Sequence, residues 1–305
     1  MTSAEPATEA APPIDAVPLP HPWRWVTAVV LLVLLGLFLY GAATNELYGW
    51  GTFAEYVFDP ELIEGAWYTI QLTVYSMVIA VVLGVLLAVM RLSPNPVLRA
   101  VSWLYLWIFR GTPVYVQLVI WGLLPSIYRN IQLGIPFGPT FFEFSLQDVQ
   151  LAFVLAVLGL ALNESAYMAE IVRAGIASVP EGQIEASTAL GMSWSLTMRR
   201  TVLPQAMRVI IPPTGNEVIS MLKTTSLVSA VPFSLELYGR SDEIGARLYE
   251  PIPLFLAAAA WYLAITSVLM VGQYYLEKYF SRGASRKLTT RQLEALAKAQ
   301  LGEQP

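Results

Sequence analysis

The amino-acid sequence predicts an all-α polytopic membrane protein with six transmembrane helices. Three observations indicate this fold class: 56% of the 305 residues are hydrophobic, only 13% are charged, and the apolar residues gather in six long runs. A helix of about 20 apolar residues crosses the hydrocarbon core of a bilayer. Nine Trp and fifteen Tyr fit the aromatic belts at the membrane surfaces. So few charges could not solvate the surface of a soluble protein of this length.

The N-terminal part of the chain holds a tail and an additional span. Residues 1–22 are rich in Pro and Ala, and we expect them to be disordered because they cannot bury enough apolar surface. The uncharged run from Trp25 to Ala43 is the first span, and we assign it with the outer loop that follows to a segment at 23–62. A cleaved signal peptide is the alternative, which the long acidic tail before the run disfavours.

Five further runs form a transmembrane domain that we assign to residues 63–280. The runs lie at 65–90, 101–124, 149–172, 209–231 and 253–276. A polar loop at roughly 174–208 joins the third of these runs to the fourth. A basic tail, expected in the cytoplasm, occupies residues 281–305.

The distribution of basic residues predicts the orientation. With a cytoplasmic N-terminus, thirteen Arg and Lys lie in the tails and loops of the cytoplasmic side, and only Arg129, Arg240 and Arg247 lie in the outer loops. Cytoplasmic loops of membrane proteins carry an excess of Lys and Arg. We therefore expect both termini in the cytoplasm and a multi-pass protein of the cell membrane.

The composition excludes several kinds of chemistry. The chain has no Cys and a single His, His21, which excludes thiolate nucleophiles, Ser-His triads and His-rich metal sites. It also lacks a Gly-rich phosphate loop of the G-x-x-x-x-G-K-[ST] type, and its net charge of -4 does not suggest a nucleic-acid partner. We expect no catalytic residue, no metal and no directly bound cofactor, so that any energy from ATP must come through a partner.

The polar loop contains the most specific motif of the sequence. Its elements are Glu185-Ala186-Ser187, then Gly191 after three residues, and Thr201-Val202-Leu203-Pro204 after nine more. A short helix is expected after Pro180, and Gly191 near its end permits the left-handed conformation of a helix C-cap. Such a helix suits docking in the cleft of a partner protein. An amphipathic helix resting on the membrane surface is the alternative.

This motif closely resembles the EAA loop of ABC importer permeases, from which Ser187 and Thr201 depart because the family usually has Ala and Ile there. Other blocks are similar to the polar amino acid branch, the histidine/glutamine/glutamate-type permeases. These blocks are Glu64–Thr73, Phe109-Arg110-Gly111-Thr112-Pro113 with Gln117, Asn163 with Ala166-Tyr167, and Gly215-Asn216 with Leu222-Lys223. The resemblance covers roughly residues 62–280. Two departures are Thr224, where the branch usually has an acid, and Glu164, where a small or aromatic residue is commoner.

The resemblance implies a permease subunit that translocates polar amino acids by alternating access, with glutamate, glutamine and basic amino acids as candidates. It also implies a cytoplasmic ABC ATPase dimer that uses ATP and Mg²⁺, an extracytoplasmic substrate-binding protein, a second permease copy or related chain, and membrane lipid around the spans. The ATPase-coupling residues that it implies are Glu185, Ala186, Gly191, Leu203 and Pro204. An ion-coupled secondary transporter and a non-transporting membrane scaffold are the alternatives.

Charged side chains inside the apolar runs indicate a hydrated pathway, because an unpaired charge in a bilayer costs at least ~2.5–3.5 kcal/mol. Glu170 and Arg173, at i and i+3, are expected to form an ion pair. We hypothesise that Glu164 lines the pathway and favours an ammonium or guanidinium group, with a structural pairing to Arg110 or Lys223 as the alternative. Those two cations are candidates for holding the α-carboxylate of an amino acid.

The predicted substrate pathway consists of polar residues from three spans. They are Arg110, Gln117, Asn163, Glu164, Tyr167, Asn216, Glu217 and Lys223. Helix breaks are expected beside them, at Gly111 with Pro113 and at Pro212-Pro213 with Gly215, because interrupted helices are common at transporter substrate sites. Plain helix kinks are the alternative.

Overall fold

The computed structural model describes residues 22–128, 130–135, 138–145 and 149–280. The predicted disordered tail up to residue 21 and the predicted basic tail at 281–305 lie outside the described residues. The chain divides into two units between Tyr48 and Gly49. The described part of the first unit consists of helix α1 (Pro22–Thr44) and the short 3₁₀ helix η1 (Glu46–Tyr48).

Helix α1 corresponds to the predicted first span. Residues Trp23–Thr44 form one helix that is long and apolar enough to cross a membrane. Its large apolar side chains, such as Leu32 and Phe38, are exposed on all sides. A helix that is apolar all round is suited to a bilayer, where lipid covers the side chains and every internal backbone group is hydrogen-bonded within the helix.

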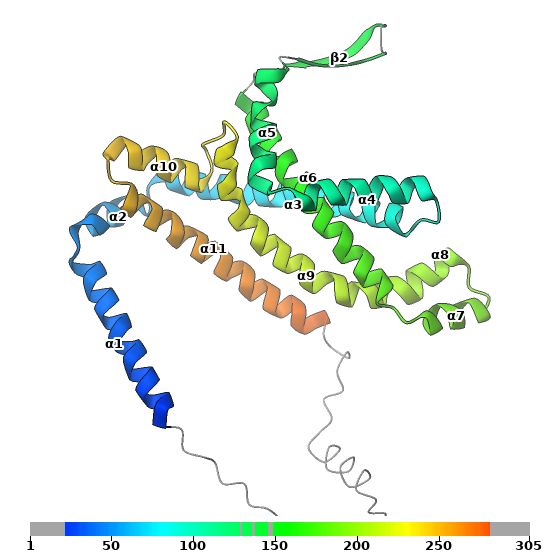
Figure 1. Ribbon diagram of the computed structural model, residues 1–305, viewed down its shortest axis with the longest axis horizontal. Coiled ribbons are helices and arrows are strands. Elements are labelled where there is room, and N and C mark those ends of the chain that lie inside the picture. The colour runs from blue at the N-terminus through cyan, green and yellow to red at the C-terminus, as the bar shows by residue number, and fades with distance from the viewer. Residues whose placement is uncertain (1–21, 129, 136–137, 146–148, 281–305) are drawn as a thin grey trace, which may run out of the picture. The chain divides into compact units, whose positions relative to one another are not determined.

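The second unit contains the remaining elements. They are α2 (Trp50–Tyr56), α3 (Pro60–Leu92), α4 (Pro96–Gly111), α5 (Val114–Ile127), β1 (Asn130–Gly134), β2 (Thr140–Ser145), α6 (Val149–Ala177), α7 (Glu181–Ala189), α8 (Trp194–Thr197), the π-helical turn η2 (Met198–Val202), α9 (Leu203–Thr224), the 3₁₀ helix η3 (Thr225–Ala230), α10 (Leu237–Leu248) and α11 (Pro251–Phe280). Figure 1 shows α7 and α8 between the ends of α6 and α9, and α10 between the opposite end of α9 and α11.

The predicted runs are helical apart from the break at Thr112-Pro113, which confirms the helical membrane class. Besides α1, the helices α3, α6 and α11 are long and apolar enough to cross a membrane, and α4 with α5 forms a fifth candidate span that is bent by 101°. The remaining predicted span corresponds to α9, which carries Arg208, Glu217 and Lys223 and is therefore more polar than the others.

Capping residues mark where α3 and α4 begin. The side chain of Asp59 accepts a hydrogen bond of 2.8 Å from the N–H of Glu61 at the start of α3. In the same way, Asn95 accepts one of 2.9 Å from Val97 at the start of α4. A Pro follows each of the two caps, where its missing N–H removes no helical hydrogen bond. The side-chain caps and the prolines thus fix the first residues of both helices.

Helices α3 and α6 form the most extensive helix pair of the described chain. Their backbones approach closely at Gly84, where an added Cβ would lie 2.5 Å from the Cβ of Met168. Around this contact the core contains buried apolar residues from α3, α5, α6 and α9, with Leu72, Leu118, Leu160 and Met221 among them. This core holds the helices that carry the polar residues of the predicted pathway.

A small β-hairpin between α5 and α6 is a feature that the sequence did not predict. Strands β1 and β2 pair antiparallel, and the register shifts between Leu133 and Gly134. Figure 1 shows the hairpin at the end of α5. Phe141 and Phe142 are exposed on β2. The segment is too short and too polar to resemble a span, and it lacks the long alternation of a strand, so periodicity gives no strand signal there.

Candidate functional site

The predicted break beside Arg110 is present. Helix α4 ends at Gly111, Thr112 is extended, and α5 begins after Pro113 with its axis turned by 101°. A break of this kind leaves the last carbonyl groups of α4 without helical partners. The bilayer offers no water to satisfy them, so protein side chains must do so.

Two side-chain amides brace this break. The Nε2 group of Gln117 donates to the carbonyl oxygens of Phe109 and Thr112, at 3.0 and 3.1 Å, and to the hydroxyl of Thr112 at 2.7 Å. The Nδ2 group of Asn163 donates to the same Phe109 oxygen at 3.0 Å and to Oε1 of Gln117 at 3.1 Å. Both residues were predicted in the substrate pathway, and their amides are engaged by the backbone of the break.

Three cavities lie along α6 near this break. The first, here called the Arg110 cavity, has a volume of about 510 Å³ and is lined by Arg91, Trp103, Leu106, Trp107, Arg110, Gly111, Tyr167 and Glu170. The middle cavity, of about 310 Å³, is lined by Arg110, Tyr167, Glu170, Pro213 and Glu217 among others. The Glu164 cavity, of about 270 Å³, is lined by Val114, Asn163, Glu164, Tyr167, Glu217, Ser220 and Thr224 among others. Tyr167 lines all three, so the cavities form a series along one face of α6.

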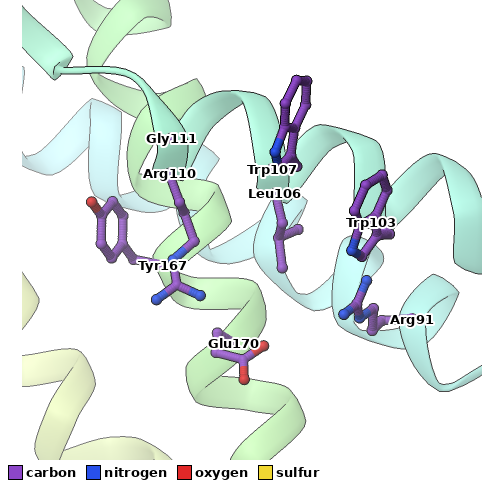
Figure 2. A pocket seen from close by; sticks show the side chains of 8 residues that line it. All are labelled: Arg91, Trp103, Leu106, Trp107, Arg110, Gly111, Tyr167 and Glu170. Carbon is purple, nitrogen blue, oxygen red and sulfur yellow. The ribbon is translucent and has the colours of Figure 1, made fainter.

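Arg110 supplies the positive charge of this series. Its guanidinium carbon lies 5.3 Å from the ring centroid of Tyr167, which is a cation–π distance. Figure 2 shows the guanidinium beside Tyr167 and above the carboxylate of Glu170. Glu170 is already paired with Arg173, whose Nε donates to Oε2 at 2.9 Å, as predicted from their spacing. Within the described part of the chain Arg110 has no ion-pair partner, so its planar fork is available to a carboxylate.

Glu164 and Glu217 supply the carboxyl groups of this series. The side chain of Glu164 is 7% exposed, and its Oε1 atom has no hydrogen-bond partner in the described chain. Neither Arg110 nor Lys223 forms an ion pair with it among the described residues. Both carboxyl groups line the Glu164 cavity. Two carboxylates beside one small cavity favour a cation there, because each ionised group repels the other and attracts an opposite charge.

Helix α9 differs from its prediction in two respects. The predicted interruption at Pro212-Pro213 is wrong, because α9 continues through both residues. Each Pro removes an N–H donor, but its fixed φ angle is helical, so the axis can continue. Asn216 and Lys223 are exposed on α9 and do not belong to the sets of residues that line the three cavities. Lys223 is therefore not placed with Arg110 around one cavity.

The predicted coupling loop folds as α7, α8, η2 and the start of α9. Helix α7 ends in a Schellman motif: Gly191 has φ 76°, its N–H donates to Thr188, and the N–H of Met192 donates to Ser187. The left-handed conformation predicted for Gly191 is confirmed. Glu185 and Ala186 are exposed on α7. Three large apolar side chains of the same loop are also exposed: Ile184 in α7, Leu190 at the end of α7 and Trp194 at the start of α8.

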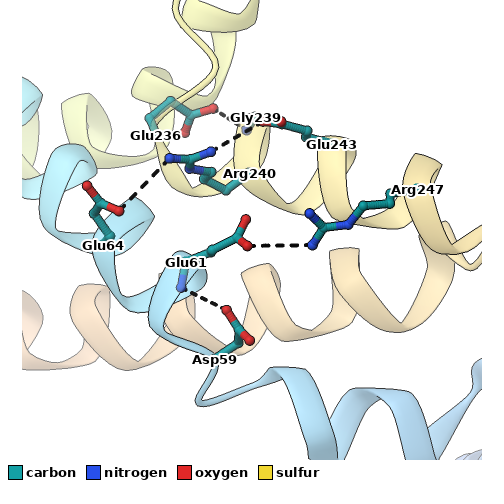
Figure 3. A network of polar contacts seen from close by, with 8 residues as sticks. All are labelled: Asp59, Glu61, Glu64, Glu236, Gly239, Arg240, Glu243 and Arg247. Atoms are coloured by element: carbon teal, nitrogen blue, oxygen red, sulfur yellow. Dashed lines mark hydrogen bonds and ion pairs between the residues drawn. The ribbon is translucent and has the colours of Figure 1, made fainter.

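A second polar cluster fastens α10 to the start of α3 (Figure 3). Arg240 lies 3.9 Å from Glu64 and 3.4 Å from Glu243, and Arg247 lies 3.5 Å from Glu61. The buried carboxylate of Glu236 caps α10 by accepting hydrogen bonds from the N–H groups of Tyr238 and Gly239, at 2.9 and 2.6 Å. Two of the three basic residues expected in the outer loops are thus neutralised by nearby acids.

Comparison with known proteins identifies the family. The profile of the family described as "Binding-protein-dependent transport system inner membrane component" matches residues 80–282. The chain belongs to this family. The arginine transport system permease protein of Corynebacterium glutamicum is 62% identical over 296 residues, which cover 96% of this chain and 92% of that protein. The histidine/lysine/arginine/ornithine transport system permease protein of Escherichia coli K12 is 39% identical over 66% of this chain and 81% of its own length.

A solved structure supports the same family. It is described as an amino acid ABC transporter with histidines, is 34% identical, has a TM-score of 0.60 and covers 72% of this chain and 94% of its own. The prediction of an ABC importer permease in the cell membrane is confirmed. Permeases of this family are transport subunits rather than enzymes, and they work with a separate ATPase and a substrate-binding protein.

The permease has several cavity residues that sequence reasoning did not select. Arg91, Trp103 and Trp107 line the Arg110 cavity, and the two indole rings are stacked with their centroids 6.2 Å apart. The spacing of the Trp residues at i and i+4 was a usable signal, since it places both on one helix face. Ser220 and Thr224 line the Glu164 cavity. Small hydroxyl side chains in an apolar helix carry no comparable signal.

Proposed function

We propose that this permease translocates cationic amino acids, with arginine as the first candidate. The observation that carries the proposal is the separation of charge along one series of cavities. Arg110 lines the first cavity and the middle one, Glu217 lines the middle cavity and the last, Glu164 lines only the last, and Tyr167 lines all three. A cationic amino acid has an α-carboxylate and an α-ammonium group at one end and a positive charge at the far end of its side chain, so its carboxylate and its side-chain charge match this order. The relatives that are named for arginine and other basic amino acids support the same substrate class.

Each charged residue then has a defined role in the proposal. Arg110 holds the α-carboxylate by two parallel hydrogen bonds. Glu164 and Glu217 attract the guanidinium or ammonium group of the side chain. Tyr167 gives an aromatic face against which a cation can move between the cavities. Asn163 and Gln117 keep the break at Gly111 in place and so position Arg110.

The assembled transporter contains three further kinds of subunit. A cytoplasmic ATPase dimer binds ATP and Mg²⁺ and contacts α7 around Glu185, Ala186 and Gly191, with Leu203 and Pro204 at the base of the loop. A substrate-binding protein delivers the amino acid to the outer side. A second copy of this permease, or a related chain, completes the pathway. ATP and the loaded binding protein favour the outward-open state, and hydrolysis releases it.

Direct substrate binding tests the role of Glu164. The permease–ATPase complex, without binding protein, would be titrated calorimetrically with arginine, lysine, glutamine and glutamate. We expect arginine and lysine to bind the native complex preferentially, and Glu164→Gln to weaken their binding about tenfold, equivalent to ~1.4 kcal/mol. Glu55→Gln, which removes an exposed carboxylate on α2, is the matched control and should bind as the native protein does. Unchanged affinity and selectivity in Glu164→Gln would exclude the proposed role.

Attachment of the ATPase is tested separately. Gly191→Trp places a side chain at φ 76°, a conformation that costs roughly 1–2 kcal/mol for L-residues, and adds bulk where α7 ends. We expect the variant to reach the membrane but to lose the ATPase during purification. Retention of the ATPase with normal substrate-stimulated hydrolysis would contradict docking at this loop.

A further inference from the structure

The two positions at which the coupling loop departs from the EAA pattern contact each other. The Oγ atom of Ser187 and the Oγ1 atom of Thr201 lie 2.9 Å apart, although 14 residues separate them in the chain. Ser187 is 5% exposed, and Thr201 is half-buried. Two hydroxyl groups in this environment each need a hydrogen-bond partner. The pair meets that need internally.

The direction of the hydrogen bond follows from the neighbouring contacts. Ser187 Oγ donates to the carbonyl oxygen of Gln183 at 2.8 Å, which uses its single hydrogen. Thr201 must therefore donate to Ser187. Gln205 completes the arrangement, because its Nε2 donates to the carbonyl oxygen of Thr201 at 2.9 Å and lies 3.4 Å from Oε1 of Gln183. We call these four residues, Gln183, Ser187, Thr201 and Gln205, the polar clasp.

The polar clasp joins the coupling helix to the helix that lines the cavities. Gln183 and Ser187 belong to α7, Thr201 to the π-helical turn η2, and Gln205 to the first turn of α9. Helix α9 then continues unbroken to Thr224 and carries Pro213 and Glu217 along the middle cavity. The distance from Leu203 to Glu217 is about 21 Å along the axis of α9. A displacement of α7 therefore has a continuous route to the carboxylate of Glu217.

We propose that the polar clasp stays closed throughout the transport cycle and that Ser187 and Thr201 are positioning residues that transmit the movement of α7 to α9. The inference rests on the proposed function, in which the ATPase moves α7. Opening the clasp would leave the half-buried hydroxyl of Thr201 without its acceptor, while Ser187 would keep its bond to Gln183, and the loss at Thr201 opposes separation of the two elements. A directional bond between the side chains also fixes the angle of α7 relative to α9, which apolar contact alone specifies less well.

A reversible cross-link tests whether the clasp remains closed. The chain contains no Cys, so Ser187→Cys with Thr201→Cys gives one possible intramolecular disulfide. A disulfide needs β-carbons roughly 3.5–4.5 Å apart, and the 2.9 Å separation of the two side-chain oxygens makes this pair a candidate for one. We expect oxidised and reduced forms of the assembled transporter to import arginine at the same rate. Loss of import on oxidation, with recovery on reduction, would overturn the proposal.

A double-mutant cycle tests the hydrogen bond itself. We expect Ser187→Ala and Thr201→Val each to lower the number of arginine molecules imported per ATP hydrolysed several-fold, while the complex assembles and melts as the native complex does. The double variant replaces both hydroxyls by apolar groups and should recover most of the ratio. Thr188→Ala is the matched control, because that hydroxyl bonds only within α7, to Ile184 at 2.9 Å.

The outcomes separate this inference from the proposed function. A native transporter that imports no cationic amino acid would refute the proposed function. A native transporter that imports arginine, with single variants that keep the native ratio of transport to hydrolysis, would refute the clasp alone. A double variant no better than the worse single variant would also refute it.

Discussion

The side-chain amides of Gln117 and Asn163 both donate hydrogen bonds to the carbonyl oxygen of Phe109, each at 3.0 Å. The acceptor lies in the last turn of α4, where no helical N–H is available to it. One amide comes from α5 and the other from α6, so three helices meet at a single backbone oxygen. These hydrogen bonds fix the backbone next to Arg110 and therefore help to set the orientation of its side chain.

Replacing Asn163 by Leu tests the importance of that brace. The change removes two buried hydrogen bonds and leaves an amide oxygen of Gln117 without its donor, which we expect to cost about 1–3 kcal/mol. The melting temperature of the purified permease complex should fall, and arginine uptake should fall with it. Thr112→Val, which removes a single acceptor of Gln117, should have a smaller effect. A normal melting temperature with lost uptake would instead indicate direct contact of Asn163 with substrate.

Replacing Arg110 by Lys separates charge from geometry. The ammonium group retains the charge but loses the planar fork and the stacking on Tyr167. We expect the affinity of the permease–ATPase complex for arginine to fall about tenfold. Affinity for agmatine, which is arginine without its carboxylate, should not change. Arg99→Lys, at an exposed position in the first turn of α4, is the control. An equal loss for both ligands would argue against carboxylate binding by Arg110.

The buried carboxyl of Glu236 predicts a pH-dependent contribution to stability. Burial raises the pKa of Glu236 above its ordinary value, although hydrogen bonds from Tyr238, Gly239 and the hydroxyl of Tyr262 act to lower this pKa. The folded protein therefore holds the proton more tightly than the unfolded chain. This contribution is fully present below the ordinary pKa of about 4.3 and is lost as pH rises through the raised pKa.

Glu236→Gln measures this contribution, because Gln does not titrate. Melting temperatures of the native complex and the variant would be compared from about pH 4 to 8. We expect the native protein to lose more stability than the variant as pH rises. Glu243→Gln, which removes an exposed acid from the same helix, should follow the native profile. Parallel profiles for native protein and Glu236→Gln would show that the carboxyl titrates normally.

Gly215 and Gln273 form a close contact between α9 and α11. A Cβ at residue 215 would overlap Oε1 of Gln273, whose Nε2 donates to the carbonyl oxygen of Pro212 at 2.8 Å. We expect Gly215→Ala to displace the flexible end of Gln273 and to destabilise the complex by about 1 kcal/mol, the net value of the hydrogen bond to Pro212 that is lost. Gly272→Ala, in α11, has open space around the added methyl group and should melt normally or slightly higher. Equal melting temperatures for the two variants would contradict a close contact at Gly215.

Local patterns were sufficient for much of the fold. Hydropathy located the spans, because a bilayer requires long apolar helices whatever their neighbours are. The break at Gly111 and Pro113, the left-handed Gly191 and the i, i+3 pair of Glu170 with Arg173 depend on residues close together in the chain. The continuous path of α9 through Pro212 and Pro213 was not predicted. A proline that interrupts a helix and a proline that the helix accommodates look the same in the local sequence.

By itself, the sequence determined that this chain is a membrane-spanning permease, which of its segments are apolar enough to lie in lipid, and where its coupling motif lies. Only the tertiary structure decided which polar groups meet. Gln117 and Asn163 are 46 residues apart, and Ser187 and Thr201 are 14 residues apart, yet each pair is hydrogen-bonded. The physical reason is that a hydrogen bond needs its two atoms within about 3 Å, a separation set by the packing of whole helices rather than by local periodicity.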